Sequence, residues 1–188
     1  VNGYYSGNMT NFINMGTAEN IQVRIAQPSE EITADTLEDV ALFVISAPLK
    51  YTSDYTGDAQ PSVFEDDFIQ TVSDYVQGGG TVIVCGLADY QDANSGLPYT
   101  TYEQANNLLE DIGSTMRVND DELIDQDENG GQPYRLYFDD FNTDSTDPLV
   151  QQVLEGVVDS GLDYSSYSGC SVSVGNGTAI VYGHDTTY

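Results

Sequence analysis

Three oxygen-bearing side chains alternate in one acidic segment, where Asp125, Asp127 and Asn129 are followed by Gly130. This spacing matches the opening of a calcium-binding loop, in which alternate oxygens surround a hard cation and the glycine permits a sharp turn. The twelfth position of such a loop carries a bidentate Glu, but here it is Leu136. The segment therefore has two interpretations. It is either an irregular calcium site or a solvated acidic turn, and calcium is the only cofactor that the sequence suggests.

Tyr, Asp and Asn residues gather in two polar loops that follow the apolar runs at 40–45 and 81–85. We expect these loops at the C-terminal edge of a sheet, where α/β proteins bind their ligands. Tyrosine rings with Asp and Asn side chains suit either a carbohydrate or a protein surface. The candidate ligand-binding residues are Tyr51, Tyr55, Asp89, Tyr90, Asp92, Asn94 and Tyr99.

The 188-residue chain has 31 Asp and Glu residues against 4 Lys and Arg, which gives a formal net charge of −27. Such a charge argues against nucleic acid and anionic membranes as partners, because phosphate groups require a basic face. The Lys-poor, Tyr-rich composition favours an extracellular or cell-surface location. Cys85 and Cys170 are the only cysteines, so they form either one disulfide or two free thiols.

Helical and strand-like periodicities alternate along the first 113 residues, which predicts a mainly parallel sheet with helices on both faces. We therefore expect one α/β domain spanning residues 1–188, a three-layer, flavodoxin-like sandwich. A Ser-x-x-Glu capping box at Ser62 and Glu65 marks the start of its clearest helix, and Gly78 is expected to end that helix in the left-handed conformation. Helices are expected at 5–16, 33–39, 62–77 and 101–112, and strands at 21–26, 40–45 and 81–85.

The periodicity is weaker after Gly113. Short strands are expected at 115–118 and 134–138, and a helix at 147–156 with Pro148 at its first position. Two further runs, 171–174 and 178–182, are joined by Gly-Asn-Gly. Because Asn-Gly tolerates the positive φ that tight turns require, these runs predict a C-terminal β-hairpin.

Three segments carry a family resemblance: Val44–Pro48, Phe68–Ala88 and Ile112–Glu122. There the chain resembles class I glutamine-amidotransferase-like domains, in particular modules related to the ThuA family and to intraflagellar-transport-like sugar-associated domains. Similar modules are embedded in large secreted bacterial proteins. The resemblance implies neighbouring domains in a longer chain, a first strand before Val1 and a last strand after Tyr188.

The same resemblance implies a catalytic role for Cys85 as nucleophile, His184 as base and Asp185 as the carboxylate that orients it. The thiolate would be stabilised by the imidazolium, and backbone N–H groups would form the oxyanion hole. The chain departs from the family's Gly-x-Cys-x-Gly turn, because the segment Val84-Cys85-Gly86-Leu87 lacks glycine at both flanking positions of that pattern. A buried thiol that packs as a small hydrophobic group is the alternative.

These observations favour a non-catalytic binding or architectural module of a secreted or cell-surface multidomain protein. Two alternatives stay open. The first is a cysteine-dependent hydrolase or amidotransferase relative that uses Cys85 and His184. The second is a calcium-stabilised structural or self-assembling surface domain.

Overall fold

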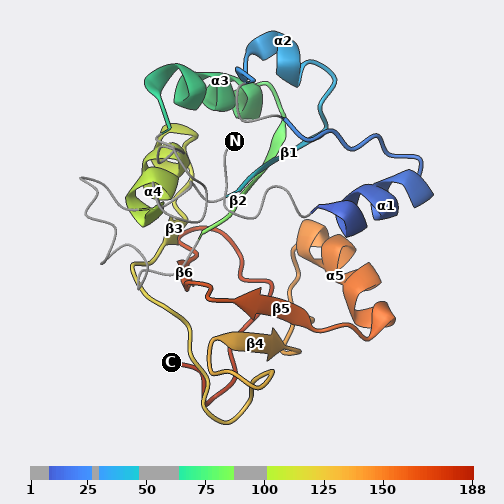
Figure 1. Cartoon of the computed structure of the whole chain (residues 1–188), viewed down its shortest axis with the longest axis vertical. Helices are drawn as coiled ribbons and strands as arrows, with labels where there is room; N and C mark the ends of the chain where they lie inside the picture. Colours follow the sequence, from blue (N-terminus) through green and yellow to red (C-terminus); the bar gives the residue numbers. More distant parts are fainter. Residues whose placement is uncertain (1–8, 27–29, 47–63, 87–100) are drawn as a thin grey trace, which may run out of the picture. The chain divides into compact units, whose positions relative to one another are not determined.

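The computed structural model describes residues 9–26, 30–46, 64–86 and 101–188, which fall into two compact units (Figure 1). Among these residues, unit 1 consists of 9–26, 30–46, 64–86 and 101–114, and unit 2 consists of 115–188. Each unit has buried apolar side chains of its own. None of the helices in the described ranges combines the length and hydropathy that a membrane crossing requires.

Unit 1 contains one parallel pair of strands, β1 (Leu42–Ile45) and β2 (Thr81–Val84), which lie side by side in Figure 1. Leu42 lies opposite Thr81, and Ile45 lies opposite Val84. Helix α3 contacts both α2 and α4. The helices of the unit are α1 (Thr10–Ala18), α2 (Ala34–Leu37), α3 (Asp66–Gln77) and α4 (Thr101–Asp111).

The core of unit 1 forms where α3 and α4 meet the end of β1. Ile45, Val72 and Leu108 are fully buried, and Phe64 is nearly so. Phe68 lies one helical turn before Val72 and stacks on Phe64 with ring centroids 5.2 Å apart. Spacing of three to four residues places such side chains on one face of a helix, and this face of α3 is the one that the periodicity predicted.

The two ends of α3 differ from the prediction. The helix begins at Asp66, after Glu65, which makes no side-chain cap hydrogen bond. Ser62, the other half of the expected capping box, lies outside the described residues. At the C-terminus Gly78 keeps a right-handed φ of −73°, and Gly79, at φ +98°, is the left-handed residue. With three consecutive glycines, the sequence alone does not determine which one reverses the chain.

Unit 2 is built from short antiparallel pairs and one long helix. Strands β4 and β5 pair with Arg135 opposite Tyr167 and Phe138 opposite Tyr164. Strands β3 and β6 form a second pair, and Phe141 makes an isolated bridge to Val181. The elements are β3 (Arg117–Val118), β4 (Arg135–Phe138), α5 (Pro148–Ser160), β5 (Tyr164–Tyr167) and β6 (Val172–Ser173).

Helix α5 confirms the predicted start and is longer than predicted. The Oδ1 atom of Asp147 accepts a hydrogen bond from the backbone N–H of Leu149 at 2.9 Å, and Pro148 follows the cap directly. The helix continues through Gly156, which was expected to end it. It ends instead at Gly161, whose φ of +63° lies in the left-handed region.

The prediction of a flavodoxin-like three-layer sandwich was wrong. Within the described ranges β1–β2 is the only parallel pair, and the remaining sheets are small and antiparallel. Residues 21–26 do not form a strand. Continuous β-branched runs indicated strands correctly, but Leu42 and Ile83 are exposed in them. A run of this kind does not reveal how many strands pair or which faces are covered.

The predicted C-terminal β-hairpin was also wrong. The turn itself forms, because the N–H of Gly177 donates to the carbonyl of Val174 at 2.7 Å. Its two arms do not pair with each other. Strand β6 pairs with β3, and Val181 pairs with Phe141. A sequence that favours a tight turn does not determine that the flanking segments pair with each other, because each can pair with a segment that is distant in sequence.

Candidate functional site

Cys85 and His184 lie in different units. Cys85 follows β2 in unit 1, where its backbone N–H donates to the carbonyl of Ile45 at 2.9 Å. Burial raises the pKa of the Cys85 thiol, which lowers the fraction of thiolate available for nucleophilic attack. His184 lies in unit 2. Both cysteines are free thiols.

The predicted ligand-binding loops fall outside the described residues. This applies to every member of the set, namely Tyr51, Tyr55, Asp89, Tyr90, Asp92, Asn94 and Tyr99.

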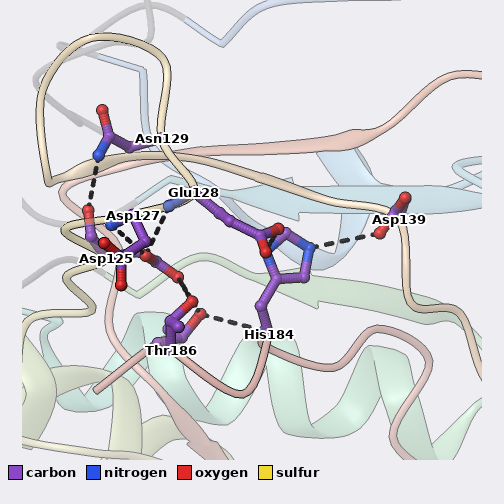
Figure 2. Close-up of polar contacts among 8 residues, drawn as sticks. Asp125, Asp127, Glu128, Asn129, Asp139, His184 and Thr186 are labelled. Atoms are coloured by element: carbon purple, nitrogen blue, oxygen red, sulfur yellow. Dashed lines mark hydrogen bonds and ion pairs between the residues drawn. The ribbon is translucent and has the colours of Figure 1, made fainter.

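The predicted calcium segment forms a tight turn around the fully buried carboxylate of Asp125 (Figure 2). Its Oδ1 atom accepts hydrogen bonds from the backbone N–H groups of Asp127 at 2.9 Å and Glu128 at 2.8 Å. The side-chain amide of Asn129 donates to the Asp125 carbonyl at 2.9 Å. This turn therefore satisfies its own polar groups.

The second carboxylate oxygen of Asp125 binds the C-terminal segment. Its Oδ2 atom accepts hydrogen bonds from the hydroxyl groups of Thr186 at 2.8 Å and Thr187 at 3.1 Å. The bond from the Glu128 N–H lowers the pKa of Asp125 most, and the Thr186, Asp127 and Thr187 bonds add to it. Together they outweigh burial and place the pKa at about 2.

These contacts give Asp125 a structural role. Protein donors occupy the four acceptor positions of its carboxylate, so a cation would have to displace them. Within the described ranges, no three His, Cys, Asp or Glu side chains are grouped as metal ligands. A calcium site at Asp125, Asp127 and Asn129 stays a prediction.

His184 lies beside this turn, and each of its ring nitrogens faces a carboxylate (Figure 2). Nδ1 is 2.9 Å from Oε2 of Glu128, and Nε2 is 3.3 Å from Oδ1 of Asp139. The ring meets Phe138 edge to face, with centroids 5.5 Å apart. The carboxylates at the imidazole are therefore Glu128 and Asp139. The family resemblance had instead implied the neighbouring Asp185.

The sequence analysis missed one surface, which we call the tyrosine–arginine face: Tyr134, Arg135, Tyr137 and Tyr167. The guanidinium carbon of Arg135 lies 5.3 Å from the ring centroid of Tyr167, within cation–π distance. Tyr134 meets the same ring edge to face, with centroids 5.4 Å apart. Arg135, Tyr137 and Tyr167 are exposed. The signal available in the sequence was the order Arg-Leu-Tyr-Phe in β4, whose residues alternate between the exposed and the buried side of the strand.

The turn around Asp125 and the tyrosine–arginine face are neighbours. The ring of Tyr137 packs directly over Gly130, so closely that a side chain at that position would displace it. The N–H of Gly130 also donates to the carbonyl of Arg135 at 2.8 Å. The turn therefore supports the face from one end.

No family model matches the sequence, and no curated protein matches it. A solved structure described as "mmIFT52 N-terminal domain" has the same fold, with a TM-score of 0.62 at 15% identity. The match covers 99% of this chain and 78% of that one. This likeness concerns the fold alone. It corrects the proposed membership in the amidotransferase-like, ThuA-related family, because the matching fold is that of an IFT52 N-terminal domain.

Proposed function

We propose that this chain is a non-catalytic protein-binding module and that the tyrosine–arginine face is its contact surface. The observation that carries the proposal is the exposure of Tyr137 and Tyr167 around Arg135 on one side of a two-stranded sheet. Tyr and Arg are the residue types that most often dominate the energy of protein interfaces, where they combine apolar area with polar ends.

The charge distribution restricts the partner. Arg117 and Arg135 are the only Lys or Arg residues between 115 and 188, in a chain of net charge −27. The field of the chain repels an acidic protein at long range, whereas Arg135 offers donors for an acceptor group at short range. The partner that fits is a neutral or basic protein that places apolar groups on the tyrosine rings and a carbonyl or single carboxylate on Arg135.

Two further observations favour binding over catalysis. The raised pKa of Cys85 disfavours a thiolate nucleophile. Both ring nitrogens of His184 face carboxylates of its own unit. An extracellular or cell-surface location and neighbouring domains in a longer chain stay predictions.

Photo-crosslinking tests the proposal. A crosslinking amino acid at Tyr137 identifies a contacting protein, which is then purified and titrated against the wild type and its variants. We expect Tyr167→Ser and Arg135→Ala each to weaken binding about tenfold or more, as for interface residues that contribute over about 1.4 kcal/mol.

Tyr182→Ser is the matched control, because Tyr182 is a similarly exposed tyrosine outside the face. It should change the affinity less than about twofold, as expected for a surface substitution outside the interface. Circular dichroism of each variant verifies folding. If the partner binds the Tyr167→Ser and Arg135→Ala variants as tightly as the wild type, this face is not the contact surface.

A further inference from the structure

His184 is the only histidine of the chain, and its side chain is only 15% exposed between two carboxylates that are 61% and 79% exposed. Both ring nitrogens are buried. Within the described residues, neither nitrogen has a partner that meets the angular limits of a hydrogen bond. Oε2 of Glu128 lies 2.9 Å from Nδ1, and Oδ1 of Asp139 lies 3.3 Å from Nε2, both within ion-pair distance.

A neutral imidazole does not fit this arrangement. It carries one N–H and one lone pair, so in either tautomer one carboxylate faces a lone pair. The imidazolium has an N–H on each nitrogen and a positive charge that both carboxylates attract. The geometry shown in Figure 2, with a carboxylate oxygen at each ring nitrogen, is therefore the one that the protonated ring satisfies on both sides.

We propose that His184 is a proton-dependent clamp. When the ring is protonated, it connects three segments of unit 2: the turn at 125–131 through Glu128, the exit of β4 through Asp139, and the C-terminal segment that carries His184 itself. When the ring loses its proton, the positive charge that holds both carboxylates is gone. The C-terminal segment then loses one of its attachments to the turn, while those of Thr186 and Thr187 to Asp125 and of Tyr188 to Gln126 remain.

The other groups around the ring do not replace this charge. Phe138 from β4 contributes an uncharged ring edge. From the segment of His184, the Oγ1 atom of Thr187 accepts the backbone N–H of His184 at 3.0 Å. Glu128 and Asp139 are the charged groups that face the ring from the turn and from the end of β4. All the charge that meets the ring is therefore negative.

The attachments that do not involve His184 limit the effect to a local opening. Asp125 still holds Thr186 and Thr187 when the ring is neutral, because hydroxyl–carboxylate bonds do not depend on the His184 proton. The expected change is thus a loosening of residues 184–188 as pH rises. Because the same turn supports Tyr137, the clamp would also regulate the binding face, a consequence that rests on the proposed function.

Amide hydrogen exchange measured by NMR from about pH 5 to about pH 8.5, the range in which histidine changes its charge, tests the clamp. The reporters are the N–H groups of Ile124, Thr187 and Tyr188, which donate to Tyr188, His184 and Ile124 at 2.9 Å. The ring ¹⁵N signals of the single histidine give its protonation directly. After correction for intrinsic exchange, protection should fall about threefold to fivefold as the ring deprotonates, in keeping with partly exposed ion pairs.

The variant His184→Gln keeps a polar side chain but has no titrating proton, so its protection should not change over this range. Asp139→Asn removes one carboxylate at a largely exposed position and should reduce the change without risk to folding. Asp127→Asn is the matched control and should behave as the wild type. Protection that stays constant while the ring titrates, or a fall that persists in His184→Gln, would overturn the proposal. The test involves no partner, so it fails independently of the proposed function.

Discussion

Replacing Leu136 measures how much the buried side of β4 stabilises the strand that carries the tyrosine–arginine face. It is fully buried in β4, between exposed Arg135 and exposed Tyr137, so its side chain lies on the opposite side of the sheet from theirs. Leu136→Ala removes three carbon groups, worth about 0.8 kcal/mol each in transfer free energy. With the cavity that remains, the loss should be about 3 kcal/mol, within the range of about 2–5 found for such changes.

Leu162→Ala is the same chemical change at a side chain that is 69% exposed, so it should cost less than about 0.5 kcal/mol. Urea unfolding followed by far-UV circular dichroism compares the two variants, and tyrosine fluorescence provides a second probe because the chain has no Trp. With a slope of about 2 kcal/mol per molar urea, the midpoint of Leu136→Ala should fall by about 1.5 M. A difference between the two variants of less than about 1 kcal/mol would show that Leu136 does not anchor the sheet.

Three further predictions test other parts of the structure. Because the folded pKa of Asp125 is about 2, below its unfolded value of about 3.9, its contribution to stability is complete above about pH 4 and is lost as pH falls to about 2; urea midpoints across this range should fall less steeply in Asp125→Asn. Native Cys85 should react slowly with iodoacetamide near neutral pH and faster once the protein is unfolded, and rapid native alkylation at about pH 6 would contradict the raised pKa. Gly156→Ala, in a helical position with free space, should stabilise by about 0.5–1 kcal/mol, whereas Gly161→Ala at φ +63° should destabilise by about 1 kcal/mol, and a reversed order in thermal unfolding would contradict the assigned end of α5.

Local features of the sequence predicted the helices well. The apolar spacing around Val72 predicted the buried face of α3, and Asp147 with Pro148 predicted the start of α5. Their ends were less predictable, because several glycines compete for the left-handed position. Gln104 shows a related difficulty: it lies in the first turn of α4, but its side-chain oxygen accepts a hydrogen bond from the distant backbone N–H of Phe64 at 3.1 Å. A polar side chain near a helix start has local and distant partners, and tertiary packing selects between them.

Strand pairing was predicted poorly for a different reason. A strand is recognised from a few residues, but its partner is determined by the whole chain. Strand β5 has the sequence Tyr-Ser-Ser-Tyr, which is neither apolar nor clearly alternating, and it was not predicted. Without β5, neither the β4–β5 sheet nor the tyrosine–arginine face could be inferred. The tyrosines that the sequence did nominate lie outside the described residues.

The candidate site illustrates why a motif of acidic residues is ambiguous in this chain. With 31 acidic residues and only 4 Lys or Arg, few carboxylates can pair with a cation from the chain itself. The buried carboxylate of Asp125 and the half-buried one of Asp121 use neutral donors instead. Asp125 binds two backbone N–H groups and two threonine hydroxyls, and Asp121 binds the backbone and hydroxyl of Ser171.

This pattern has a consequence for His184. Hydrogen bonds from backbone and hydroxyl groups keep their strength across the neutral pH range, because neither partner titrates there. The proposed clamp is different, since the positive charge between Glu128 and Asp139 depends on a proton on the ring. The contact of His184 with Glu128 and Asp139 is therefore the attachment of the C-terminal segment that the proposed clamp makes dependent on a proton, whereas the bonds to Asp125 are not.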